Sequence, residues 1–322
     1  MKLYFTIVFL LQLASAANTI RWTLHRNCYE NDLYRESMIR AVETAKSRSA
    51  FAASKIKSLG ALDLLNSFRR LANLLVTFDG LKTLGARYEK FAGVEGPIGA
   101  NSGFADSPEW TGRSNPSNID FVIYCAPDLA RVPDYPEFTY DRAKMRVLAS
   151  DNPLLQIQKD IEANKFADKE KINLAVTFNA PSTMIENQEE AAKIPDTITV
   201  NPVWMATKNQ EGELFSSDEK FEKMKKKGAL AELKKEWKGD KKATPVDKMF
   251  NDLAGTIHHE MFHLSAFGAH LDLPEKSPKA YNWMYNVEMK ILDNPELMAL
   301  LALIFDLKEN KKVMVNKDGE LK

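Results

Sequence analysis

His259-Glu260-Met261-Phe262-His263 is the most informative segment of this 322-residue chain, which has five histidines in all. On an α-helix, residues four apart lie on the same face, so His259 and His263 can bind one metal ion. Glu260 follows the first histidine directly and is therefore close enough to act on a water bound to that metal. The segment predicts a metal site, provided that it lies on a helix.

The sequence around this segment favours a helix that begins near Asp247, after Thr244-Pro245, and ends at Gly268. An apolar stripe at helical spacing runs through it, made of Leu253, Ile257, Met261 and Leu264. On such a helix, H-E-x-x-H is typical of zinc-dependent peptidases. The expected metal is Zn2+, with Glu260 as the general base. The adjacent His258 points about 100° away from His259 and is expected to pack rather than to bind metal.

A catalytic zinc site needs a third protein ligand and leaves its fourth position to water. Three residues after the motif can supply it: His270, Asp272 and Glu288. His270 lies seven residues after His263, and Asp272 lies nine residues after His263. The residues alone leave these alternatives open.

Two later segments resemble a known family. Gly268-Ala269-His270-Leu271-Asp272, followed by Ala280-Tyr281-Asn282-Trp283, is similar to the aspzincin pattern G-T-x-x-D-x-x-Y-G. The segment from Asp293 to Leu303 also resembles the Asn-Ala-Asp segment and apolar helix of these proteins. Aspzincins are deuterolysin-like and peptidyl-Lys metalloendopeptidases, mostly secreted by fungi. The resemblance is specific from about Leu253 to Asp306.

The resemblance implies a role for each of five residues. His259, His263 and Asp272 would bind zinc, Glu260 would be the general base, and Tyr281 would stabilise the oxyanion. The reaction implied is hydrolysis of a peptide bond by a zinc-activated water, which makes the chain a zinc metalloendopeptidase. Peptidyl-Lys members use acidic residues near the Asn-Ala-Asp segment to receive a lysine side chain, and Glu296 is the candidate for this role.

The chain also departs from the family pattern. The family's threonine is absent, with Ala269 or His270 in its place, and Asn282 replaces a glycine. Tyr281 follows Asp272 by nine residues instead of three. These changes support an alternative, a non-catalytic secreted binding protein on a metallopeptidase scaffold. The intact Glu260 favours the enzyme.

The N-terminus predicts secretion. Lys2 precedes an apolar run from Leu3 to Leu13, and Ala14-Ser15-Ala16 is a small-x-small cleavage site, so residues 1–16 are expected to be a signal peptide. The only two cysteines, Cys28 and Cys125, are then expected to form a disulfide. The alternative is two buried free thiols.

Charge excludes several classes of partner. Lysine and arginine together number 44, as do aspartate and glutamate, and loss of the signal peptide removes one lysine. This balance gives no electrostatic basis for binding nucleic acid or an anionic membrane. The expected partner is a protein or peptide substrate, and the expected state is a monomer.

The remaining segments predict an α+β fold. Helices are expected from Asp32 to Phe78 with a break at Gly60, and strands over 119–125, 173–178 and 197–200. With the resemblance, the prediction is one zincin-like domain over 17–322, in which helices pack on a small, mostly antiparallel sheet. It combines an N-terminal helical layer (about 32–92) with a catalytic part (about 119–306). The strand at 197–200 is the candidate edge for an extended substrate.

Residues 215–242 contain ten lysines and six acidic residues. A docking surface for an acidic partner is one interpretation of this composition. The mixed signs favour another, a solvated pair of helices with internal ion pairs.

Overall fold

The computed structural model describes residues 19–60, 65–98, 119–132, 135–168, 172–179, 186–187, 189, 194–238, 242–275 and 277–322. The predicted signal peptide lies outside these residues, as does most of the segment between the helical layer and the first predicted strand. No helix in the described ranges is both long and apolar enough to span a membrane.

The fold is α+β, with two sheets. The larger has five strands in the order β2-β1-β3-β8-β7, and the smaller has three in the order β4-β5-β6. The strands are β1 Ile20–Leu24, β2 Val94–Glu95, β3 Phe121–Tyr124, β4 Leu129–Val132, β5 Tyr135–Asp141, β6 Arg146–Leu148, β7 Ala175–Phe178 and β8 Asp196–Val200.

The prediction of a mostly antiparallel sheet is wrong for the larger sheet. β1 pairs in parallel with β2 and β3, and β3 pairs in parallel with β8, so only the β7–β8 pair is antiparallel. The reason is the length of the connections. The chain between β1 and β2 contains four helices, and long crossovers of this kind return a strand in the same direction. The smaller sheet is antiparallel.

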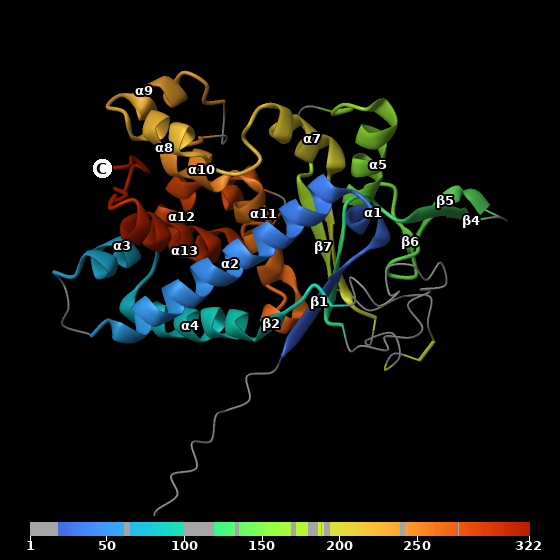
Figure 1. The fold of residues 1–322 in the computed structure, drawn as a ribbon, viewed down its shortest axis with the longest axis horizontal. Coiled ribbons are helices and arrows are strands. Elements are labelled where there is room, and N and C mark those ends of the chain that lie inside the picture. The colour runs from blue at the N-terminus through green and yellow to red at the C-terminus, as the bar shows by residue number, and fades with distance from the viewer. Residues whose placement is uncertain are drawn as a thin grey trace, which may run out of the picture.

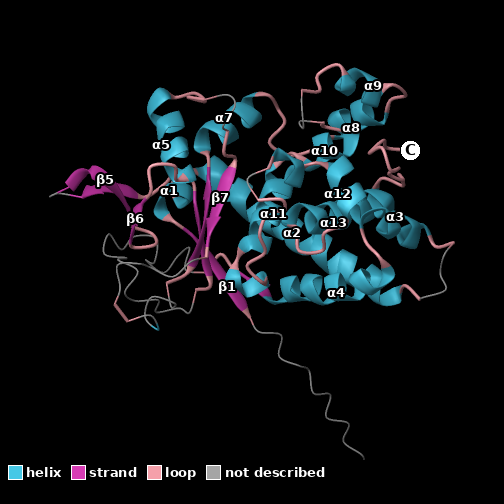
Figure 2. Ribbon diagram, turned by 180° about the vertical axis from the view of Figure 1, so that it is seen from behind, coloured by secondary structure: helices cyan, strands magenta, loops and turns pink. Residues whose placement is uncertain are grey.

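Helices make up most of the remaining structure (Figure 1). Figure 2 shows the larger sheet at one side of the helical part, with α11 next to β7. The helices are α1 Arg26–Tyr29, α2 Asp32–Ser58, α3 Ser67–Leu75, α4 Phe78–Glu89, α5 Pro153–Ala163, α7 Pro202–Gln210, α8 Asp218–Lys225, α9 Ala229–Lys234, α10 Pro245–Phe250, α11 Leu253–His263, α12 Trp283–Met289 and α13 Pro295–Asn310.

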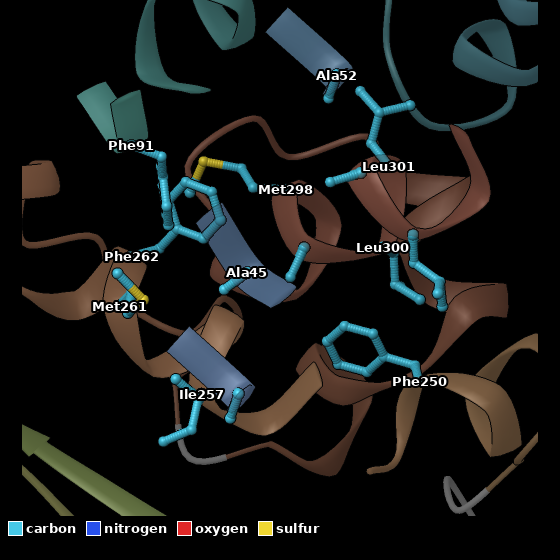
Figure 3. Packing of buried hydrophobic residues seen from close by; sticks show 14 of the residues in the cluster. Ala45, Ala52, Phe91, Phe250, Ile257, Met261, Phe262, Met298, Leu300 and Leu301 are labelled. Carbon is cyan, nitrogen blue, oxygen red and sulfur yellow. The ribbon is translucent and has the colours of Figure 1, made fainter. Parts of the chain in front are cut away.

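The core joins the N-terminal helices to the C-terminal ones. The long helix α2 packs against α4, α11 and α13. Small residues of α2, among them Ala45 and Ala52, allow this close approach (Figure 3). Opposite them lie Ile257 and Met261 of α11 and Leu301 of α13, all fully buried. Burial of such side chains contributes about 1.5–3 kcal/mol each, which fixes α11 against its neighbours.

The predicted N-terminal helices are present with one difference. α2 ends at Ser58, close to the predicted break at Gly60. The predicted second helix corresponds to α3, which ends at Leu75 instead of Phe78. A further helix, α4, begins at Phe78, where the Thr77 side chain accepts a 3.3 Å hydrogen bond from the Gly80 amide. The predicted strands correspond to β3, β7 and β8.

The predicted substrate edge at Thr197–Val200 is wrong. This segment is β8, which lies between β3 and β7 and is buried along its whole length. The edge strand on this side of the sheet is β7, whose residues are all half-buried. Two short strands of similar composition cannot be ordered in a sheet from their sequences, because order depends on the partners available.

The predicted disulfide is confirmed. Cys28 of α1 and Cys125, directly after β3, are bonded to each other, and both are buried. The alternative of two free thiols is therefore wrong. The bond ties the first helix to the middle of the larger sheet.

Candidate metal centre

Helix α11 carries the motif, but it is shorter at both ends than predicted. Residues 245–250 form a separate helix, α10, because the Asp252 side chain caps α11 through a 2.8 Å hydrogen bond from the Gly255 amide. At the other end α11 stops at His263, and a short 3-10 turn separates it from Gly268. His259 and His263 thus lie on the last full turn of the helix.

The structure brings three of the predicted metal-binding residues together. His259 Nε2 lies 3.1 Å from His263 Nε2 and 3.1 Å from Asp272 Oδ1. His263 Nε2 lies 3.5 Å from the same carboxylate oxygen. Among the residues that the structure describes, this is the one group of histidine, cysteine or acidic side chains with metal-site spacing.

Outer hydrogen bonds set which ring nitrogens face the centre of this group. His263 Nδ1 lies 2.6 Å from the backbone oxygen of His270, and His259 Nδ1 lies 2.9 Å from Glu296 Oε2. A carbonyl oxygen and a carboxylate accept hydrogen bonds, so each Nδ1 carries the hydrogen and donates it. Each Nε2 therefore directs a lone pair toward the other and toward Asp272, as metal-binding histidines do.

These distances fit a divalent cation. Ligand atoms about 2.0–2.1 Å from a tetrahedral zinc ion lie about 3.3 Å from one another, close to the separations of this group. Asp272 Oδ1 is buried and accepts no hydrogen bond in the described structure. Two imidazole nitrogens and one carboxylate oxygen converge here, and a bound cation would interact favourably with all three.

The charges around His259 also favour a cation. Burial lowers the pKa of His259, but Asp272 and Glu296 outweigh it, and the pKa lies well above its usual range. For Asp272, burial raises the pKa, but His259 and His263 lower it by more, so the carboxylate stays ionised. An imidazole between two carboxylates attracts positive charge, whether a proton or a metal ion.

Glu260 lines a cavity beside this group. The cavity has a volume of about 550 Å³, and its wall includes His259, Glu260, Tyr281 and Glu296. Thr177 of the edge strand β7 donates a 2.6 Å hydrogen bond to Glu260 Oε2. The carboxylate is thereby held by the sheet while it faces the space next to the predicted ligands.

Tyr281 reaches the same site despite the longer connection. Its hydroxyl donates a 2.5 Å hydrogen bond to Asp272 Oδ2, and its ring lies 5.4 Å from the ring of His259. Desolvation and the Asp272 carboxylate raise the pKa of the Tyr281 phenol, so it remains a proton donor. The residue that replaces the family's glycine, Asn282, caps α12 through a 2.8 Å hydrogen bond from the Tyr285 amide.

The other candidate ligands lie apart from the group. The side chain of His270 faces Asp293, with 3.6 Å between Nδ1 and Oδ1, and Glu288 is exposed on α12. His258 is fully buried and lies 2.7 Å from Ser49 Oγ of α2, consistent with the packing role predicted for it.

The sequence did not predict the roles that two residues, Glu296 and Thr177, have in the site. Glu296 orients His259, whereas the sequence suggested it only as a receiver of substrate lysine, and Thr177 was not singled out. Thr177 is 83 residues from Glu260, and no local pattern connects the two. Its position in an expected strand was the only available signal.

Comparison of the chain with protein-family models, with curated proteins and with solved structures finds no match.

Proposed function

We propose that this chain is a secreted zinc-dependent endopeptidase of the aspzincin type. The observation that carries the proposal is the convergence of His259 Nε2, His263 Nε2 and Asp272 Oδ1. Of these residues, His259 lines a cavity together with Glu260, next to an edge strand. Two imidazoles and one carboxylate are a ligand set of catalytic rather than structural zinc sites, which are closed by four protein ligands.

Zinc bound by these residues would lower the pKa of a coordinated water and polarise a carbonyl group. Glu260 is the residue placed to accept the proton of an attacking water and to pass it to the leaving amine. The hydrogen bond from Thr177 occupies Oε2, while no hydrogen bond reaches Oε1 from the described residues. One carboxylate oxygen is thus anchored and the other is available for proton transfer.

Tyr281 has two roles open to it. Its hydroxyl donates to Asp272 Oδ2, so it orients the carboxylate whose other oxygen faces the histidines. To stabilise an oxyanion, the same hydroxyl has to leave Asp272 and turn toward the substrate. The side chain is half exposed, so the protein does not enclose it on all sides.

The substrate is a polypeptide in extended conformation. The edge strand β7 leaves backbone groups available beside the cavity, and an added strand takes its hydrogen bonds from such an edge. Secretion follows from the predicted signal peptide and agrees with the disulfide, a bond that persists in oxidising compartments.

A second candidate is a secreted protein that binds zinc and a peptide without cleaving it. The engagement of the Tyr281 hydroxyl by Asp272 favours it, because an oxyanion donor would then be missing. The two candidates share the metal site and differ in the use of Glu260.

The test is to measure zinc content and cleavage of a peptide library by the mature protein, the Glu260→Gln variant and the Asp272→Ala variant. An endopeptidase binds stoichiometric zinc and cleaves; Glu260→Gln retains the zinc but loses cleavage, and Asp272→Ala loses both. A wild-type protein that binds zinc and cleaves nothing would support the second candidate. Zinc retained by Asp272→Ala would remove Asp272 from the ligand set.

A further inference from the structure

A second cavity, here called the lysine groove, lies beside the cavity lined by His259 and Glu260, which is called the Glu260 cavity below. It has a volume of about 550 Å³ and is bounded by α8, α9, α10 and the end of α7. Three glutamates line it together with six lysines, which are Lys208, Lys220, Lys223, Lys226, Lys227 and Lys248.

Lysines outnumber glutamates in the lining of the lysine groove by six to three, although Glu213 lies near Lys220 and Lys248 as well as Lys208. Lys208 is paired with Glu213 at 2.8 Å, and Glu232 is paired with Lys235 at 2.7 Å. Within the described ranges, no carboxylate forms an ion pair with any of the other five lysines of the groove, which are Lys220, Lys223, Lys226, Lys227 and Lys248. Of the internal ion pairs expected for residues 215–242, the described part of this segment (215–238 and 242) contains one, between Lys235 and Glu232.

Burial lowers the pKa of Lys220. Asp252 and Glu213 act to raise this pKa, and Lys208 and Lys248 act to lower it. A bound anion would stabilise the charged form of this lysine.

The lysine groove and the Glu260 cavity share part of a wall. Four residues line both: Leu233 and Glu236 on α9 and just after it, and Lys248 and Asn251 on α10 and just after it. Ala175 of β7 and Glu260 also line the Glu260 cavity. A polypeptide that extends from the edge strand through this cavity and across the shared wall would reach the lysines.

We propose that the lysine groove binds an acidic segment of the polypeptide substrate, at a distance from the bond that is cut. This inference rests on the proposed peptidase function. A peptide is favoured over a sulfated glycan or a nucleic acid because the groove adjoins the cavity that holds Glu260 and the edge of β7. The balanced charge of the whole chain provides no long-range attraction for a polyanion.

The test measures binding separately from cleavage. The Glu260→Gln variant is titrated with a fluorescein-labelled peptide of alanine, glycine and serine, and with the same peptide extended by a run of glutamates on either its N-terminal or its C-terminal side. One of the two extended peptides is expected to bind about tenfold tighter than the neutral peptide. The gain should shrink when salt is raised from about 50 to about 300 mM, because salt screens exposed charges.

Substitutions locate the binding site. A triple variant with Lys223→Gln, Lys226→Gln and Lys227→Gln is expected to lose the gain, and the corresponding triple change to arginine is expected to keep it. The matched control removes the same charge elsewhere through Lys57→Gln, Lys82→Gln and Lys159→Gln, all at exposed positions on α2, α4 and α5. Thermal unfolding of each variant checks that the fold is intact.

Three outcomes would overturn the proposal. In the first, neither acidic extension improves binding of the peptide. In the second, the control triple variant loses as much of the gain in affinity as the groove variant does. In the third, a sulfated glycan binds through the same lysines while neither acidic peptide gains, and the groove then belongs to a glycan. Because binding is measured in the Glu260→Gln variant, an absence of cleavage by the wild type would count against the proposed function alone.

Discussion

Thr177 of β7 and Glu260 of α11 are joined by a 2.6 Å hydrogen bond between the threonine hydroxyl and the Oε2 of the carboxylate. This contact connects the edge strand, where a substrate would lie, to the proposed general base. Helix α11 sets the position of the Glu260 backbone, and the hydrogen bond from β7 orients its carboxylate.

We predict that Thr177→Val lowers kcat for peptide cleavage by about tenfold and leaves KM nearly unchanged. Valine keeps the shape and strand preference of threonine but cannot donate to the carboxylate, and a hydrogen bond to a charged group contributes about 1.5–3 kcal/mol. Steady-state kinetics on one peptide substrate measures the effect. Thr177→Ser, which restores the hydroxyl, should recover most of the rate; equal losses in both variants would assign the effect to packing.

We predict that Glu296→Gln weakens zinc binding by about tenfold without unfolding the protein. Glu296 accepts the His259 Nδ1 hydrogen, and loss of such an outer partner typically reduces metal affinity by about 10–100-fold. Glutamine still accepts the hydrogen bond but does not carry the negative charge, so the loss should lie at the lower end. Competition with a chromogenic chelator gives the zinc dissociation constant.

The control for this prediction is Glu288→Gln. Glu288 is exposed on α12, outside the group of predicted ligands, so its substitution should leave zinc affinity unchanged. A larger loss from Glu288→Gln than from Glu296→Gln would contradict the assignment and return Glu288 to the ligand set.

We predict that Asp247 makes the protein less stable as the pH rises from about 4 to about 7. Burial raises the pKa of Asp247 to about 7, although hydrogen bonds from Thr244 and Trp283 oppose the shift. The unfolded pKa is about 3.9, so the folded state holds a proton in this interval that the unfolded state has released. Stability then falls with rising pH, by at most about 1.4 kcal/mol per pH unit, and becomes level above pH 7.

Urea unfolding of the wild type and of Asp247→Asn, both in EDTA, measures this contribution. The variant loses part of the α10 cap and is expected to be less stable at every pH. Its deficit should be largest near pH 4 and should shrink toward pH 7, because only the wild-type side chain titrates. A deficit that does not vary with pH would show that Asp247 is ionised throughout.

The sequence indicated the parts of the site that depend on local spacing. His259 and His263 are one helical turn apart, so their shared face follows from helix geometry. Asp272 was proposed from a resemblance over a short segment, and in the structure its carboxylate lies beside the two histidines. Glu296 and Thr177 reach the site from α13 and β7, so their roles depend on tertiary packing that no spacing in the chain encodes.

In the fold as well, local elements were predictable from the sequence, whereas features that depend on distant segments were not. The helices α2 and α3 were visible as an apolar stripe and β3 as an apolar run, whereas α13 was expected from the family resemblance. The strand β1 was missed, because Ile20–Leu24 begins only a few residues after the predicted signal peptide and has a charged residue near its start. The direction of the sheet was also missed, since each parallel pair joins segments separated by long crossovers.

We predict that Gly255→Ala is strongly destabilising, although alanine is the better helix former. In α11, alanine would gain about 1 kcal/mol over glycine from helix propensity. A Cβ at position 255 would, however, lie 1.9 Å from the backbone oxygen of Phe250, and that oxygen belongs to the turn that joins α10 to α11 and cannot move aside as a side chain can. The clash outweighs the propensity, and we expect a net loss of about 2 kcal/mol or more in the free energy of unfolding, together with weaker zinc binding because the start of the motif helix shifts.

The matched control is Gly85→Ala in α4, where the nearest atom to the added Cβ is Ile56 Cγ2 at 3.1 Å, the end of a side chain that can adjust. Urea unfolding should find Gly85→Ala within about 1 kcal/mol of the wild type. Equal effects at the two positions would show that the backbone between α10 and α11 yields, and that its close approach does not hold the motif helix in place.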